Sequence, residues 1–169
     1  MVTWKAEDPD ADLVRVTAQF RPPGSASWFT LSERISDPFY VFDARSLPDG
    51  LYRLRLTADD ASSNPEGESQ TSIFELPDFA VDNTPPILAL AAAGAGKLAV
   101  SAEDGTAVQA VRYSVDGEPW QALSSPGWVP GSRTFSAELA VPPGGPRWIT
   151  VEAVDPFRNR AARAWLAER

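Results

Sequence analysis

Carboxylates are the most abundant side chains in this sequence that could do chemistry. The chain has 23 Asp and Glu against 15 Lys and Arg, and it contains no His and no Cys. Without imidazole or thiol groups it cannot form a Ser-His-Asp or Cys-His nucleophile, a Cys/His zinc site or a disulfide. The chemistry that remains is cation binding by acidic oxygens, or hydrolysis by paired carboxylates.

The densest acidic segment is EDPDAD, residues 7–12. Asp8, Asp10 and Asp12 alternate along it, as hard oxygen ligands do at the start of a calcium loop. The match with an EF-hand loop then ends, because Leu13 stands where that loop needs Gly and Gln19 where it needs Glu. The segment is therefore predicted to be a turn whose carboxylates accept hydrogen bonds from nearby backbone N–H groups.

Asp82 and Asn83, in the segment VDNTPP, are the second pair of possible calcium ligands. With Asp59 or Asp60 nearby they would be similar to a cadherin linker, in which calcium stiffens a domain junction. The Asp-Asn pair is the whole of that match, so a turn at a hinge is the preferred interpretation. We expect no resident metal and no cofactor.

Trp128 is the aromatic residue best placed for a ligand, because it lies in the Pro/Gly loop SPGWVPGS. An exposed indole there could stack on a sugar ring or on a partner's side chain. The alternative is a ring folded over the end of a sheet.

Paired carboxylates do not indicate an enzyme here. A chain with 23 acidic residues offers such pairs by chance. Asp60 and Asp155 recur at the same place in the two halves of the chain, each followed four residues later by Asn, as turn caps would. We therefore expect a protein without catalytic activity.

The elements that position these residues are predicted to be strands. Sixteen Pro and eleven Gly separate short apolar or alternating segments, a pattern typical of antiparallel sheets joined by turns. The Ala-rich segments ILALAA and RAARAWLAER are the best helix candidates by propensity, but ILALAA is predicted to be a strand. RAARAWLAER can be interpreted as a helical tail, but its place in a repeat favours a closing strand. The predicted strands are residues 2–6, 13–20, 28–31, 39–43, 51–59, 69–76, 87–92, 97–104, 110–116, 120–123, 133–141, 147–155 and 162–167.

Three features recur in the same order about 95 residues apart, which indicates tandem domains. AED at residues 6–8 returns at 102–104, a Gly-Trp hairpin at 24–31 returns at 117–123, and the strand ending at Asp60 returns before Asp155. In this alignment the first segment, residues 2–10, matches the second strand of the second copy, so unit one is expected to be truncated at its N-terminus. Alternation predicts the core residues Val14, Val16, Phe20, Trp28, Tyr52, Leu54, Leu56, Val111, Tyr113, Trp120, Ile149, Val151 and Trp165.

The segments LPDGLYRLRLTADDASSNP, VDNTPP, VRYSVDGEPWQAL and ITVEAVDPFRN resemble tandem immunoglobulin-like or fibronectin type III-like modules of bacterial proteins. The resemblance implies an all-β chain of two antiparallel β-sandwiches, residues 1–82 and 87–169, with a Pro-rich hinge at 83–86. It also implies part of a longer, exported protein, periplasmic or secreted, such as one built on a β-propeller.

The resemblance and the absence of a catalytic set together predict a non-catalytic spacer or interaction module, with a protein or a surface polymer as partner. The alternative is a carbohydrate-binding module that uses loop aromatics such as Trp128. A net charge of -8 argues against nucleic-acid binding, and no apolar run is long enough to predict membrane insertion.

Overall fold

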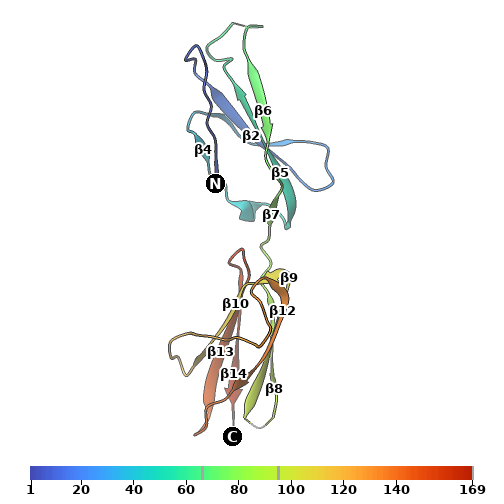
Figure 1. Ribbon diagram of the computed structural model, residues 1–169, viewed down its shortest axis with the longest axis vertical. Helices are drawn as coiled ribbons and strands as arrows, with labels where there is room; N and C mark the ends of the chain where they lie inside the picture. Colours follow the sequence, from blue (N-terminus) through green and yellow to red (C-terminus); the bar gives the residue numbers. More distant parts are fainter. Residues whose placement is uncertain (66, 95, 169) are drawn as a thin grey trace. The chain divides into compact units, whose positions relative to one another are not determined.

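The computed structural model describes residues 1–65, 67–94 and 96–168, and it is all-β, as the alternation predicted (Figure 1). The described residues contain one short 3-10 helix, Ala44–Ser46, and no helix among them is long and apolar enough to cross a membrane. The chain divides into two compact units, Met1–Val81 and Asp82–Arg169. The predicted hinge residues 83–86 therefore group with unit 2.

Unit 2 consists of two antiparallel sheets. The first has the strand order β12 (Ser132–Ala140), β9 (Lys97–Val108) and β8 (Ile87–Ala92). The second has the order β11 (Gln121–Ala122), β10 (Ala110–Val115), β13 (Arg147–Val154) and β14 (Arg160–Ala167). The Ala-rich segment ILALAA thus forms strand β8, and RAARAWLAER contains β14, as its place in the repeat predicted.

One core holds the two sheets of unit 2 together. Leu98, Val100 and Phe135 from the first sheet and Ile149 and Val151 from the second belong to a single buried cluster. Because each strand alternates, most of its other residues lie on the outer face. Two sheets packed face to face in this way make a β-sandwich.

Unit 1 has a larger sheet with the order β3 (Phe29–Ile35), β2 (Arg15–Arg21), β5 (Gly50–Asp59) and β6 (Thr71–Glu75), and β7 (Phe79–Val81) also pairs with β5. A small sheet of β1 (Val2–Thr3) and β4 (Phe39–Tyr40) lies against it. Val2 of the small sheet and Val16, Leu54 and Leu56 of the larger one share a core.

The two units repeat one strand order. In each, the strands at matching places in the sequence form one four-strand path, β3-β2-β5-β6 in unit 1 and β11-β10-β13-β14 in unit 2. The pairing of β1 with β4 corresponds to that of β9 with β12. Strand β8 has no counterpart in residues 1–65 and 67–81, the described part of unit 1.

The predicted core residues are buried or half-buried, except for two tryptophans that lie on outer faces. Val16, Tyr52, Leu54, Leu56, Val111, Ile149 and Val151 are buried. Phe20, Tyr113 and Trp165 are half-buried against these cores, and Val14 is half-buried.

The prediction was wrong for the two tryptophans of the repeated hairpin, which lie on outer faces. Arg55 is 4.3 Å from the ring centroid of Trp28, and Arg112 is 4.6 Å from that of Trp120. Both arginines belong to the outward-facing set of their strands, so each indole covers a guanidinium instead of entering the core. Trp120 remains 42% exposed.

Substitutions in unit 2 test this assignment. Phe135 is 2% exposed, so Phe135→Ala should lower the free energy of unfolding by about 3–5 kcal/mol, through lost apolar burial and a cavity. Trp120→Ala should lower it by less than about 1.5 kcal/mol, because only an exposed cation–π contact is lost. Urea denaturation followed by circular dichroism measures both, and equal losses would contradict the placement of Trp120.

Candidate functional site

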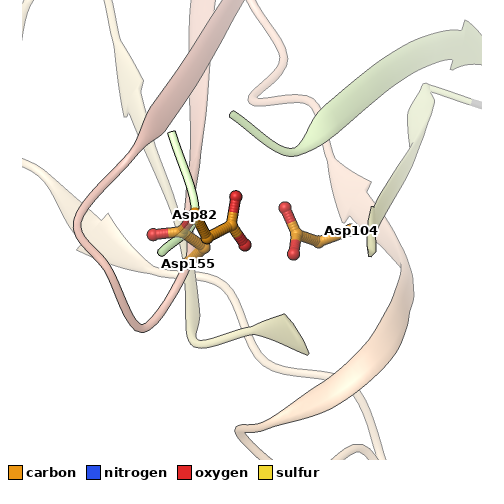
Figure 2. Close-up of side chains that lie close together, drawn as sticks. All are labelled: Asp82, Asp104 and Asp155. Atoms are coloured by element: carbon orange, nitrogen blue, oxygen red, sulfur yellow. The ribbon is translucent and has the colours of Figure 1, made fainter. Parts of the chain in front are cut away.

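Three carboxylates gather at one end of unit 2. Asp82, Asp104 and Asp155 each place one carboxylate oxygen within 4.8 Å of the others. Figure 2 shows the side chains of Asp82 and Asp155 next to each other, facing that of Asp104. Asp104 and Asp155 are buried and Asp82 is half-buried.

Three separate segments supply these side chains. Asp82 precedes β8, Asp104 lies within β9, and Asp155 follows the last residue of β13. The register of β9 against β12 shifts between Ser132 and Thr134, close to Asp104 in the fold. Such an irregularity redirects a side chain at the end of a strand, here toward the end of the sandwich.

Asp104 closes a turn within its own strand. Its Oδ1 accepts hydrogen bonds from the backbone N–H groups of Thr106 at 2.8 Å and Ala107 at 2.9 Å. A buried N–H without a partner destabilises a fold, so this oxygen replaces the ladder bonds lost at the irregularity.

Asp155 and Asn159 close the loop between β13 and β14. Asp155 Oδ1 accepts a hydrogen bond from the backbone N–H of Asn159, and Oδ2 accepts one from its amide Nδ2, both at 2.7 Å. The same Nδ2 donates to the backbone oxygen of Asp82 at 2.8 Å. Asn159 therefore ties the segment before β8 to this loop.

Asp82 is held in the same manner. Its Oδ1 accepts a hydrogen bond from the backbone N–H of Thr84 at 3.0 Å, and its Oδ2 accepts one from the Thr106 hydroxyl. Five of the six carboxylate oxygens thus accept hydrogen bonds, and only Asp104 Oδ2 has no donor in the described part of the chain.

The arrangement offers the oxygen donors that calcium prefers, because carboxylate and hydroxyl oxygens are hard ligands. No Lys or Arg within the described ranges forms an ion pair with the three aspartates. Asp82, Asp104 and Asp155 are the residues that could hold a cation.

The acidic segment of unit 1 forms the predicted turn. Asp8 Oδ1 accepts hydrogen bonds from the backbone N–H groups of Asp10 at 2.9 Å and Asp12 at 3.2 Å. Asn64 Nδ2 donates to Asp12 Oδ2 at 2.8 Å. No acidic cluster that could hold a metal is found in unit 1 among the residues that the structure describes.

Two turn-capping residues match between the units. Asp60 accepts a hydrogen bond from the backbone N–H of Gln70 at 2.7 Å and is buried, as its counterpart Asp155 is. Sequence reasoning identified both as caps, but it did not predict that Asp104 and Asp155 lie beside Asp82. The sequence feature that could have indicated the cluster is the repeat, because it places an Asp at the end of each pair of matching strands: Asp8 and Asp104, and Asp60 and Asp155.

Trp128 packs on the core of unit 2. Its ring meets that of Phe135 edge-to-face, with centroids 5.0 Å apart. The indole Nε1 is buried and has no hydrogen-bond partner in the described residues. This packing is that of a ring folded over the end of the sandwich, and the ligand-contact role of Trp128 stays a prediction.

Comparisons with known proteins do not assign the chain to a family. No protein-family model matches the chain, and no curated protein matches its sequence.

Removal of the capping oxygens should destabilise unit 2. We expect Asp104→Ala and Asp155→Ala each to lower the free energy of unfolding by about 1–3 kcal/mol, because buried donors lose their acceptors. Asp10→Ala, at an exposed position, is the matched control and should change it by less than about 0.5 kcal/mol. Urea denaturation measures all three, and buried variants as stable as the control would refute the capping role.

Calcium titration tests whether the cluster of Asp82, Asp104 and Asp155 holds a cation or serves only as caps. A cation held by this cluster would raise the unfolding temperature saturably at millimolar Ca²⁺, because it binds only the folded state. Asp104→Asn, which keeps an oxygen for the backbone but removes a charge, would abolish that rise. An unfolding temperature that does not respond to Ca²⁺ would leave the carboxylates as caps alone.

Proposed function

We propose that this chain is a non-catalytic spacer and interaction module of a larger exported bacterial protein, with two immunoglobulin-like or fibronectin type III-like units. The observation that carries the proposal is the use of the buried carboxylates. The carboxylate oxygens of Asp104 and Asp155 accept hydrogen bonds from backbone N–H groups at loop ends. A general acid or a nucleophile needs its carboxylate directed at a substrate instead.

The shared strand order of the two units supports the choice of modules. Each unit pairs a four-strand path with a second sheet, and sandwiches of this kind occur in many cell-surface proteins. Fold alone does not fix function, so the argument for an interaction role depends on exposed surface. Ile73 and Phe74 of β6 are 62% and 65% exposed, in a unit that also has a buried core. The two side chains point to opposite faces of the sheet, and each leaves apolar surface in solvent along β6, the last strand of its four-strand path.

Binding to immobilised peptide and glycan libraries tests the proposal. We expect the full chain to be retained on peptides and to leave them unchanged in mass, because the module binds without chemistry. A ligand whose mass changes during incubation would show an enzyme. Retention on glycans alone, lost in Trp128→Ala while stability is kept, would establish the carbohydrate-binding alternative.

A further inference from the structure

The outer face of the four-strand path in unit 1 carries three neighbouring arginines. It is the face opposite Val16 and Leu54, which point into the core that the path shares with β1. Alternation places Arg21 of β2 on it, together with Arg53 and Arg55 of β5. Arg21 pairs directly with Arg53, and like charges at paired positions destabilise a sheet. In a chain of net charge -8, this concentration of positive charge calls for a carboxylate.

One of the three arginines has acidic partners. Arg53 Nε donates to Asp78 Oδ1 at 2.7 Å, and Arg53 Nη1 lies 3.8 Å from Glu75 Oε2. Arg21 and Arg55 form no ion pair with any residue that the structure describes. Two guanidinium charges on this face are therefore left without a carboxylate in the described part of the chain.

Trp28 brings these two guanidinium groups to one place. Its ring centroid is 4.9 Å from Cζ of Arg21 and 4.3 Å from Cζ of Arg55. All three side chains are half-buried. Contact with an indole removes water from one side of a guanidinium group, and a charge with less water around it attracts an opposite charge more strongly.

Gln19 holds the Arg55 guanidinium in position. Gln19 Oε1 accepts hydrogen bonds from Arg55 Nη2 at 2.6 Å and from Arg55 Nε at 3.1 Å. A guanidinium group has five N–H donors, so these two bonds leave others for a ligand. The planar group suits a carboxylate, which can accept two parallel hydrogen bonds from it.

In unit 2 the matching arginine has a carboxylate within the fold. Trp120 lies over Arg112 as Trp28 lies over Arg55. Arg112 Nε donates to Glu152 Oε1 at 2.8 Å, and Glu152 is paired with Arg112 and only 8% exposed. The residue paired with Arg55 is a neutral glutamine. Unit 1 thus lacks the internal carboxylate that unit 2 places beside the same kind of indole contact.

An apolar side chain lies on the same outer face. Ile73 of β6 pairs with Thr57, which shares the outward set of β5 with Arg55. Ile73 is therefore a diagonal neighbour of Arg55, and it is 62% exposed. Tryptophan and arginine are the residues most enriched where protein partners bind. An acidic polysaccharide has no aliphatic side chain to cover Ile73, so the combination favours a polypeptide.

We propose that this face binds an acidic segment of a partner polypeptide. Carboxylates of the segment accept hydrogen bonds from Arg21 and Arg55 beside Trp28, and an aliphatic side chain of the segment covers Ile73. Charge complementarity selects this occupant, because the partner supplies the carboxylate that an internal glutamate supplies in unit 2. The inference rests on the proposed interaction role and names the partner's chemistry.

A fluorescently labelled peptide rich in Glu and Leu tests the proposal, with a peptide of equal length rich in Ser and Leu as the reference. Each is titrated with the full chain while anisotropy is recorded. An acidic chain repels an acidic peptide unless a local basic site binds it. We expect saturable binding of the Glu/Leu peptide below about 1 mM at low salt, weakened at higher ionic strength, and no saturation with the Ser/Leu peptide.

Substitutions locate the binding site. Arg21→Gln and Arg55→Gln should each weaken binding of the Glu/Leu peptide about threefold, and the double variant about tenfold. Ile73→Ser should weaken it about threefold. Arg133→Gln is the matched control, because it removes the same charge from an exposed position in unit 2 and should leave binding unchanged.

The urea unfolding midpoint of each variant should equal that of the unchanged chain, which separates lost binding from lost folding. Absence of saturation would overturn the proposal, as would an equal loss in Arg133→Gln and Arg55→Gln. Binding of polygalacturonate, an acidic polysaccharide, without binding of the Glu/Leu peptide would overturn it as well. These outcomes leave the non-catalytic role standing, which fails only if a ligand is chemically altered.

Discussion

The constraint on which this structure depends is that the apolar face of each four-strand path must be shielded from water by a second sheet. Ile149, Val151 and Ala153 of β13 are each 0% exposed because β9, β12 and β8 close over them. Burial of apolar area contributes roughly 25 cal/mol per Å², and no other favourable term is as large in a chain without disulfides. The strand order, the alternation and the caps at loop ends all serve that closure.

Closure brings a second requirement at the ends of the sandwich. Where strands stop or shift register, backbone N–H groups become buried without a ladder partner. Aspartate is suited to these places, because a short side chain can accept bonds from one or two N–H groups at once. Asp104, Asp155 and Asp82 each do this, and their convergence follows from three loops that end at the same edge.

Sequence patterns predicted the strands well because alternation is local: Tyr52, Leu54 and Leu56 are two residues apart and share a buried face. The same reasoning failed for Trp28 and Trp120, since a large aromatic side chain also gains from covering an arginine on the outer face. The acidic cluster could not be predicted as a cluster. Asp82, Asp104 and Asp155 are far apart in the sequence, and only the crossing of β8, β9 and β13 brings them together.

The two units therefore bury their inner faces to different extents, and the difference is the presence of β8 in unit 2. With β8, the residues Leu98, Val100 and Ala102 are fully covered; without a counterpart in the described part of unit 1, Ala6 and Phe74 remain in solvent. The small sheet of β1 and β4 buries Val2 against Leu54 and Leu56, which gives unit 1 a core of its own. The two units thus share one strand order, and the cover that β8 provides accounts for the deeper burial of β9 in unit 2.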